Sequence, residues 1–324
     1  MRIYQIIAIL FALLAVLIRF LLRELDLPSF IVSTALHVVM FDLIPSKNLN
    51  FSIPESGILR GIQHKDIVLR NEGNVYLRLY ARNFSVPRPV LLYIHGGGFA
   101  LGDVSGTNDV CSLFADLTDA IVASVNYRLA PSYKFPAALE DVRESLVWIE
   151  RNIESFGGSL DKMAIMGESA GGNLAAAAIA TNIDQPYLHH PLRHAFLIYP
   201  AIEQGSIRES NFVNRNKDGL LTMTQLLYFW SLYLNDVNER NDYRACPIVT
   251  PDHILAKFPP TTMVLAKNDP ILDEGLELCR RLKVNGVDVQ IDLYNSTIHG
   301  FFGKFGPGIA ALKKTAHIFL QGMA

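Results

Sequence analysis

The sequence predicts an α/β protein in which helices cover both faces of a mostly parallel sheet. Short apolar runs of strand length alternate with longer segments of helical spacing along most of the 324 residues. Several of these runs are apolar throughout, as expected of strands that are buried on both faces. Half of the residues are hydrophobic, which is enough for a large core.

Eight segments have the composition of strands. The first two, 66–70 and 74–82, are predicted to form a hairpin because Asn71–Gly73 supplies turn residues between them. The other six strand predictions are 90–95, 120–127, 162–167, 195–200, 261–267 and 287–294. Helices are predicted at 137–153, 273–285 and 309–321.

Charge and cysteine content give no indication of nucleic-acid binding, a metal site or a disulfide framework. The net charge is −2 and no Lys/Arg-rich stripe is present, so nothing indicates a nucleic-acid partner. Cys111, Cys246 and Cys279 are far apart and have neither a metal-ligand spacing nor a disulfide framework. One disulfide is possible, but buried free thiols are the expectation.

The N-terminal segment 1–22 predicts a membrane signal-anchor. Ile3–Ile18 carries no charge and the apolar character extends to Leu22, at the short end of the ~17–25 residues that span a bilayer. A cleaved signal peptide and a soluble amphipathic helix are the alternatives. No clear cleavage site follows, because Arg19 and Arg23 come next.

A long segment, 201–258, separates two predicted strands by more than an ordinary loop. It contains 220–234, which is rich in Leu and aromatic residues. This part is either a helix packed by one apolar face or a cap over the carboxyl ends of the strands, where open α/β sheets bind ligands. Its nearly continuous apolar character favours the cap. We expect a cap insertion at about 203–256, with Phe99, Phe229 and Trp230 lining a substrate pocket.

The predicted organisation therefore has three parts. Residues 1–22 form the anchor, 23–61 form a linker and the N-terminal part of the cap, and 62–324 form the catalytic domain.

The stretch IMGESAGGNLAAAAIA (165–180) predicts a reactive serine. An apolar run ends in Gly-Glu-Ser-Ala-Gly and passes at once into an Ala-rich, helix-favouring segment. A sharp turn there presents the Ser169 hydroxyl, and Gly167 and Gly171 leave room for the neighbouring strand and helix. This is the geometry of a nucleophile elbow. The alternative is a small-residue helix start with Ser169 as its cap.

A serine nucleophile needs a histidine base and an acid that orients it. With this elbow the order along the chain is serine, acid, histidine. His299 follows the last strand, in a loop at its carboxyl end, so it is the predicted base. The other histidines after Ser169 precede a strand or lie in the cap or a helix: His189, His190, His194, His253 and His317.

The acid is predicted to leave the end of the preceding strand. Asp269 directly follows the strand 261–267, and Pro270 then stops that strand. Asp273 and Glu274 are rivals, but they fall at the start of the next helix, where acidic residues are usual for dipole reasons.

The run of three glycines in YIHGGGFALGD (93–103) follows another strand. Glycine lets backbone amides turn toward a ligand, so the loop is either an oxyanion hole or a phosphate-binding loop. It lacks the Lys-Ser/Thr of a phosphate loop, which favours the oxyanion hole. Two glycine amides of this loop and the Ala170 amide are the expected donors.

Together these motifs resemble the hormone-sensitive-lipase-like branch of the α/β-hydrolase family. The motifs that carry the resemblance are HGGGFA (95–100), NYRLAPSYKFPAALED (126–141), GESAGGNLA (167–175), YP (199–200), DPILDEG (269–275) and HGF (299–301). The resemblance implies an α/β-hydrolase fold with an eight-stranded sheet and a helical cap. It implies these site residues: Ser169, Asp269 and His299 as the triad, Gly97, Gly98 and Ala170 as oxyanion donors, and His95 and Gly96 as loop-shaping residues.

The activity that the resemblance implies is that of a serine carboxylesterase. A small-molecule ester would form an acyl-enzyme on Ser169, with no metal or cofactor. An amidase or deacetylase that acts on N-acyl, arylacetamide-like substrates is the alternative. A non-catalytic small-molecule binding protein is the other, because fold alone does not fix function.

The N-terminus is similar to that of membrane-anchored esterases of the arylacetamide deacetylase and neutral cholesterol ester hydrolase type. This similarity implies the endoplasmic reticulum membrane with a lumenal catalytic domain; a secreted or cytoplasmic protein is the alternative. Three N-x-Ser/Thr patterns occur, at Asn50, Asn83 and Asn295. The chain departs from the family pattern at Glu168, Ser132 and Leu272, and none of these is a triad position.

Overall fold

A computed structural model describes residues 57–324, apart from 205–207, 209, 211–220 and 305. The predicted anchor at 1–22, and nearly all of the predicted segment 23–61, lie outside the described residues. Within the part of the chain that the structure describes, no helix is long and apolar enough to cross a bilayer.

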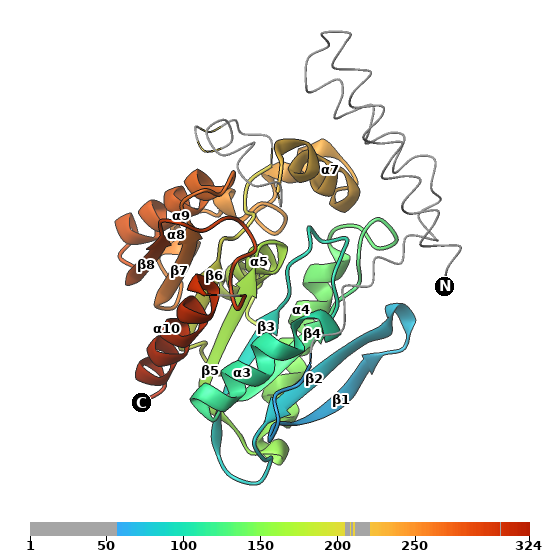
Figure 1. Ribbon diagram of the computed structural model, residues 1–324. Coiled ribbons are helices and arrows are strands. Elements are labelled where there is room, and N and C mark those ends of the chain that lie inside the picture. The colour runs from blue at the N-terminus through green and yellow to red at the C-terminus, as the bar shows by residue number, and fades with distance from the viewer. Residues whose placement is uncertain (1–56, 205–207, 209, 211–220, 305) are drawn as a thin grey trace, which may run out of the picture. The chain divides into compact units, whose positions relative to one another are not determined.

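An eight-stranded sheet forms the centre of the described domain, in the order β1-β2-β4-β3-β5-β6-β7-β8 (Figure 1). β1 (Gln63–Arg70) and β2 (Val75–Ala81) form the predicted antiparallel hairpin. β2 also pairs antiparallel with β4, and every later pair is parallel. The remaining strands are β3 (Arg88–Ile94), β4 (Ile121–Asn126), β5 (Gly158–Glu168), β6 (His194–Ile198), β7 (Thr261–Ala266) and β8 (Val289–Tyr294). The mostly parallel, eight-stranded sheet is confirmed.

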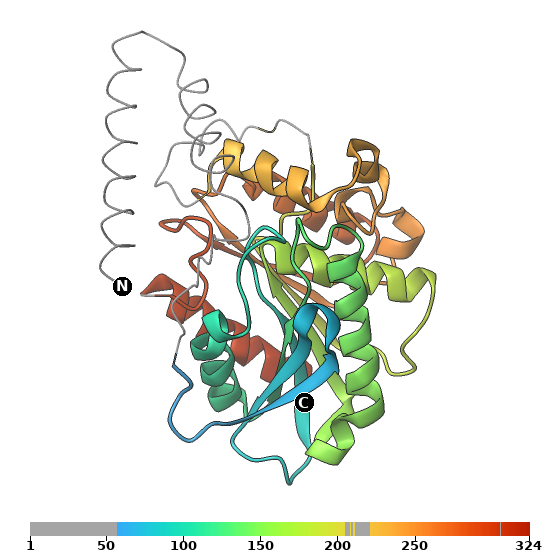
Figure 2. The same ribbon diagram turned by 90° about the vertical axis from the view of Figure 1, so that its right-hand side faces the viewer.

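Helices cover both faces of this sheet, as predicted (Figure 2). One face carries α4 (Ala137–Asn152), α5 (Ala170–Asp184) and α9 (Leu272–Val284). The other face carries α3 (Asn108–Thr118) and α10 (Pro307–Gly322), the teal and red helices of Figure 2. Two parallel strands run in the same direction, so the chain must cross back along the sheet between them. A helix on one face of the sheet is the usual form of this connection.

The sheet separates two apolar cores. Along β3, Val90 and Leu92 point into the core beneath α4 and α5, while Leu91 and Tyr93 point into the core beneath α3 and α10. All four side chains are at most 1% exposed. The continuous apolar run of the sequence is therefore a strand buried on both faces, because successive side chains alternate across the sheet. The three cysteines are buried free thiols.

One long helix, α3, was not among the sequence predictions. Its buried residues Val110, Phe114 and Thr118 recur at helical spacing, and Phe114 packs edge-on against Phe319 of α10 at a centroid distance of 5.4 Å. The apolar members of this stripe stand at helical spacing in the sequence itself, so the pattern was sufficient to predict the helix.

The segment between β6 and β7 holds the predicted cap helix. This helix is α7 (Met223–Tyr233), which lies above the carboxyl ends of the strands in both views (Figures 1 and 2). It begins with a capping box in which Thr222 and Gln225 satisfy each other's backbone amides. Leu226, Trp230 and Tyr233 are its buried residues.

Several short helices connect these elements. The connecting helices are η2 (Glu72–Asn74), η3 (Ser105–Thr107), η4 (Ile153–Phe156), η5 (Val237–Asn241), η6 (Pro247–Val249) and α8 (Asp252–Leu255).

Candidate active site

Ser169 lies at the junction between β5 and α5. Its φ of 54° and ψ of −119° are strained for a residue that has a side chain. Two of its backbone hydrogen bonds join it to the segment at the end of β6: its N–H donates to the Ile198 carbonyl at 2.9 Å, and its carbonyl accepts from the Ala201 N–H at 3.1 Å. The carboxyl end of β6 therefore stabilises the turn that presents the Ser169 hydroxyl.

The glycines on either side of Ser169 allow two close backbone approaches. A Cβ on Gly167 would lie 2.1 Å from the Gly171 carbonyl oxygen, and a Cβ on Gly171 would lie 2.1 Å from the Ile94 carbonyl oxygen. No side chain fits at these distances. The start of α5 is thus pressed against the ends of β3 and β5, which is the nucleophile-elbow geometry.

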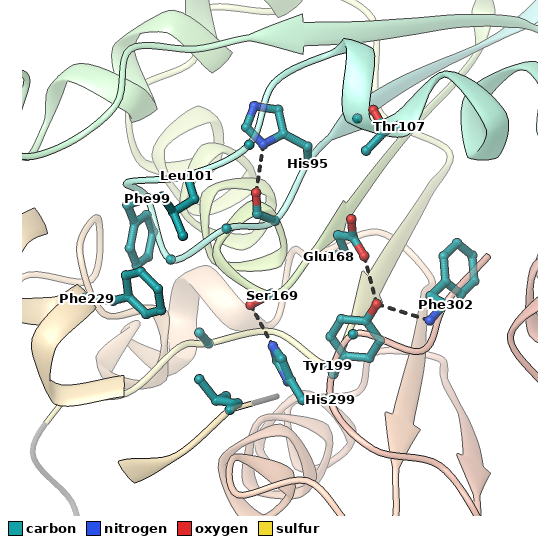
Figure 3. A pocket seen from close by; sticks show the side chains of 18 of the residues that line it. His95, Phe99, Leu101, Thr107, Glu168, Ser169, Tyr199, Phe229, His299 and Phe302 are labelled. Carbon is teal, nitrogen blue, oxygen red and sulfur yellow. Dashed lines mark hydrogen bonds between the residues drawn. The ribbon is translucent and has the colours of Figure 1, made fainter. Parts of the chain in front are cut away.

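Three predicted residues form one hydrogen-bonded line. The Ser169 Oγ lies 2.8 Å from the His299 Nε2, and the His299 Nδ1 lies 2.7 Å from the Asp269 Oδ2 (Figure 3 shows the first pair). Because a carboxylate only accepts, Nδ1 carries the imidazole proton and Nε2 is left to accept from the serine. The arrangement is that of a serine-histidine-aspartate triad.

Hydrogen bonds hold both oxygens of the Asp269 carboxylate. Asp269 is 1% exposed, and its Oδ1 accepts the Ile271 N–H at 2.9 Å, so its Oδ2 remains directed at His299. The loops that carry the acid and the histidine are joined, because the Asn268 N–H donates to the Thr297 carbonyl at 3.0 Å. Asp269 and His299 are therefore carried by two joined loops at the ends of β7 and β8.

The rival acids lie in the first turn of α9, where the sequence predicts them. The Asp273 Oδ2 accepts the Ser210 N–H at 2.7 Å, and the Glu274 Oε1 accepts the Ile202 N–H at 2.9 Å. Burial raises the pKa of Glu274 well above its usual value. Both carboxyl groups tie the segment after β6 to α9.

The other histidines after Ser169 occupy the positions that the sequence predicts for them. His194 is the first residue of β6, at the opposite end from the site, and burial lowers its pKa to about 4. The remaining four lie before β6, on α8 and on α10: His189, His190, His253 and His317.

The glycine-rich loop after β3 passes beside Ser169. A Cβ on Gly96 would lie 3.2 Å from the Ser169 Cβ, so the loop backbone is in contact with the elbow. Gly97 and Gly98 have φ values of 120° and 60°, which favour glycine. Ala170 is the first residue of α5, so its amide lies among the N–H groups that a helix leaves without intrahelical acceptors.

His95 supports this loop from within the core. It is 1% exposed, its Nδ1 lies 2.7 Å from the Gly96 carbonyl oxygen, and its ring stacks on Tyr127 at 4.3 Å. The Tyr127 hydroxyl donates to the His95 carbonyl at 3.0 Å. Burial lowers the pKa of His95, which favours the neutral ring.

A family model described as the α/β-hydrolase fold matches residues 91–303, which include all of these features. The chain belongs to the α/β-hydrolase family. The resemblance predicted from the sequence motifs is confirmed. So is the predicted fold.

Named relatives of this hydrolase include esterases. "Esterase LipI" of Mycobacterium tuberculosis is 32% identical over 229 residues, which cover 70% of each chain. "Arylacetamide deacetylase" of Oryctolagus cuniculus is 28% identical over 287 residues, which cover 70% of this chain and 72% of the relative. The Pyrobaculum calidifontis esterase structure matches at a TM-score of 0.75 and 32% identity, covering 84% of this hydrolase and 88% of that chain.

Ser169 and His299 of the hydrolase open into a cavity of about 350 Å³. The wall toward the cap is apolar and is formed by Leu221, Leu226, Phe229 and Trp230. The opposite wall, toward α3, is more polar and is formed by Asp103, Thr107, Asp109, Val110 and Lys304. The cavity beside Ser169 is thus lined both by apolar residues of the cap and by more polar residues near α3.

The three predicted pocket residues all line the cavity, but they differ in exposure. Phe99 and Trp230 are each only 2% exposed and pack against each other at a centroid distance of 5.3 Å. Phe229 is partly exposed and lies beside Phe99 on the wall that faces Ser169 (Figure 3). Phe229 is therefore the side chain of the three that presents most of its surface to the cavity.

The sequence analysis missed a carboxylate–tyrosine cluster beside Ser169. The Glu168 side chain accepts from the Tyr93 hydroxyl at 3.1 Å and from the Tyr199 hydroxyl at 2.7 Å. Glu168 had been noted only as a departure from the family pattern, and Tyr199 only as part of a motif. The available signal was a tyrosine directly after a buried strand that neighbours the elbow strand.

Proposed function

We propose that this hydrolase is a serine carboxylesterase in which Ser169, His299 and Asp269 form the triad. The observation that carries the proposal is the continuous hydrogen-bonded line of these three side chains, which opens into a partly apolar cavity. The names of the relatives support ester hydrolysis as the reaction class.

Acylation begins when the Ser169 Oγ attacks the ester carbonyl carbon. His299 accepts the serine proton at Nε2, and Asp269 stabilises the resulting imidazolium through Nδ1–H. The tetrahedral intermediate collapses as the carbon–oxygen bond of the alcohol breaks. The departing alkoxide takes the proton from Nε2, which leaves an acyl group on Ser169.

Deacylation repeats these proton transfers with water. His299 accepts a proton from the water as the water oxygen attacks the acyl carbon, and then returns a proton to the Ser169 Oγ. The carboxylic acid leaves and the triad regains its starting state. Each step balances without a co-reactant other than water.

Negative charge on the carbonyl oxygen needs donors that are already in place. We assign this role to the backbone amides of Gly97, Gly98 and Ala170. The contact between the glycine-rich loop and the Ser169 Cβ, and the position of Ala170 at the N-terminus of α5, support the assignment. His95 and Gly96 would shape the loop.

Hydrolysis of p-nitrophenyl esters from acetate to laurate by the full chain in detergent tests the proposal. We expect Ser169→Ala to lower kcat by on the order of 10⁶-fold, as for other triad serines. Ser155→Ala, which changes an exposed serine, is the matched control and should keep full activity. A folded parent without turnover on any ester would contradict the proposal.

An amidase is the second candidate, and one observation favours it. Two of the matched relatives are named arylacetamide deacetylase, each 28% identical to this chain. Rates on p-nitrophenyl acetate and 4-nitroacetanilide compare an ester and an amide with the same acyl group. A higher kcat/KM on the amide would assign the chain to the amidases.

We further propose that residues 1–22 anchor the hydrolase in the endoplasmic reticulum membrane with its catalytic domain in the lumen. The uncharged run Ile3–Ile18 supports this. Carbonate extraction of cell membranes should retain the full chain and release a chain that lacks 1–22. Residues 23–61 are proposed to form a linker and the N-terminal part of the cap, with the cap insertion at about 203–256.

A lumenal domain can be tested through its glycosylation sites. Asn83 is partly exposed between β2 and β3, and Asn295 is exposed just after β8. A mobility shift with an endoglycosidase, lost in Asn83→Gln or Asn295→Gln, would support the lumenal orientation. Full sensitivity of the domain to protease added outside intact microsomes would contradict it.

A further inference from the structure

The Tyr199 hydroxyl joins the nucleophile's neighbour to the loop of the base. It donates to the Glu168 Oε2 at 2.7 Å and accepts the Phe302 backbone N–H at 3.2 Å (Figure 3). Glu168 directly precedes Ser169, and Phe302 is the third residue after His299. One phenol therefore connects the two short segments whose separation sets the Ser169–His299 distance.

The ring of Tyr199 lies against the base itself. Its centroid is 4.8 Å from that of the His299 imidazole, with 56° between the ring planes. The Phe301 ring also packs against Tyr199, at a centroid distance of 5.6 Å. Tyr199 thus contacts the histidine loop by its ring and by its hydroxyl.

The backbone at Tyr199 is built to hold this position. Its φ of 33° is rare for a residue with a side chain and is strained. Its N–H donates to the Val264 carbonyl at 2.7 Å, and Tyr199 is 1% exposed. Tyr199 is therefore held directly after β6 by a hydrogen bond to β7, the strand that precedes Asp269.

The Tyr199 phenol is protonated, as a hydrogen-bond donor to a carboxylate must be. Burial and the neighbouring Glu168 carboxylate raise the pKa of Tyr199 well above its usual value, so the phenol keeps its proton. The same two causes raise the pKa of Tyr93, which donates to the other oxygen of Glu168. Both oxygens of Glu168 are thus held by neutral hydroxyl groups.

We propose that Tyr199 is a positioning residue that holds His299 against Ser169, with Glu168 as its fixed support. This inference rests on the proposed role of His299 as the base. Proton transfer from Ser169 depends on a short, aligned contact, and a displacement of about 1 Å can cost on the order of 10²-fold in rate. Loss of the hydroxyl would free the Phe302 end of the loop without removing a reacting atom.

Tyr199→Phe in the full chain tests the proposal, with Tyr80→Phe as matched control. Tyr80 is also fully buried, and its hydroxyl donates to the Asn108 Oδ1 at 2.7 Å, so the control loses one buried phenol hydrogen bond, whereas Tyr199→Phe loses two. Tyr93→Phe removes the other donor to Glu168 and leaves the link to Phe302. Thermal unfolding of the three variants reports any general loss of structure.

Two readouts are measured for each variant: kcat and KM on p-nitrophenyl butyrate, and the rate of Ser169 modification by a fluorophosphonate. In the second reaction the Ser169 Oγ–P bond forms, the P–F bond breaks, fluoride leaves and His299 takes the serine proton. This readout needs a working Ser169–His299 pair but no ester substrate. It therefore separates the inference from the proposed esterase activity.

We expect Tyr199→Phe to lower kcat and the modification rate by on the order of 10- to 100-fold, with KM nearly unchanged. Tyr80→Phe should keep both rates, and Tyr93→Phe should lose less than Tyr199→Phe. Unchanged rates in Tyr199→Phe, or equal losses in Tyr93→Phe, would overturn the inference. A parent that reacts with the fluorophosphonate but not with esters would overturn the esterase proposal alone.

A second variant keeps the inference testable if Tyr199→Phe does not fold. Glu168→Ala leaves Tyr199 in place but removes the acceptor that fixes its hydroxyl. A loss of modification rate in the same range supports the positioning role. A parent in which the fluorophosphonate does not label Ser169 at all would overturn it, because no base would then be in position.

Discussion

Gly98 lies directly against the ring of Phe229. A Cβ at residue 98 would be 2.3 Å from the Phe229 Cγ and 2.5 Å from its Cδ1. Gly98 belongs to the loop after β3, and Phe229 belongs to α7. The cap helix therefore touches the proposed oxyanion loop, and the position of one constrains the other.

Gly98→Ala is expected to lower kcat on p-nitrophenyl butyrate by on the order of 10²–10³-fold, the cost of losing one oxyanion donor. The new Cβ meets the Phe229 ring, and a φ of 60° is strained for alanine, so the loop shifts. Gly286→Ala is the control, because Gly286 has a φ of 83° but nothing within 4 Å of the added atom.

The double variant Gly98→Ala/Phe229→Ala distinguishes two causes of the loss: the collision of the new Cβ with the Phe229 ring, and the strained backbone of alanine at position 98. Removal of the ring takes away the collision, so the double variant should regain part of the lost kcat. A double variant as slow as Gly98→Ala would show that the Phe229 contact is not the cause.

Phe229→Ala is expected to move the chain-length optimum toward longer acyl esters. Its ring forms part of the apolar cavity wall, so its removal enlarges the space beside Ser169. Values of kcat/KM from acetate to laurate measure the change. Leu227→Ala alters the exposed face of the same helix, where Leu227 is 50% exposed, and should leave the profile as it is.

Trp230→Ala should act on stability first. Trp230 is 2% exposed and packs on Phe99 and Tyr233, so its truncation leaves a cavity in the core. A loss of about 3–5 kcal/mol in the free energy of unfolding is expected in urea titrations. A fully stable Trp230→Ala with an altered chain-length profile would mean that Trp230, like Phe229, sets the size of the acyl pocket.

The sequence predicted a site residue wherever a chemically suitable side chain directly follows a predicted strand. Ser169 was predicted because its glycine-flanked turn joins an apolar run to a helix-favouring segment, and His299 and Asp269 because each follows a strand whose end faces the same edge of the sheet. These are local signals. The strand pattern of a parallel sheet is local too, since buried strands are apolar throughout.

The features that the sequence analysis missed depend on partners far along the chain. Helix α3 is the exception, because its apolar stripe is present in the sequence at helical spacing. The link from Glu168 through Tyr199 to Phe302 joins three segments that meet only in the folded sheet. The difference in exposure between Phe229 and its neighbour Trp230 follows from how α7 packs, which composition does not encode.

Asp269→Asn should lower kcat by on the order of 10⁴-fold, because an amide cannot fix the imidazole tautomer as a carboxylate does. Asp273→Asn is the matched control, four residues along the chain. It keeps an oxygen that can accept the Ser210 N–H, so activity should remain. A larger loss in Asp273→Asn than in Asp269→Asn would reverse the assignment of the acid.

Glu274 should make the stability of the protein fall as pH rises. The carboxyl group is 4% exposed, and burial raises its pKa well above the value of about 4.3 that it has in an unfolded chain. Between these two pKa values the folded protein binds one proton more than the unfolded chain. The free energy of unfolding therefore loses about 1.4 kcal/mol per pH unit in that window, starting above pH 4.3.

Glu274→Gln removes this ionisation and keeps an oxygen for the Ile202 N–H, which the Glu274 Oε1 accepts at 2.9 Å. In urea titrations from pH 5 to pH 8, the variant should gain stability relative to the parent as pH rises. Glu277→Gln, one turn along α9, changes a carboxylate whose pKa the Arg280 side chain lowers, so it should add no such slope above pH 5. Parallel curves for the parent and Glu274→Gln would mean that Glu274 ionises in the folded state as it does in the unfolded chain. Its link to the segment after β6 would then be a charged hydrogen bond whose contribution to stability does not change between pH 5 and pH 8.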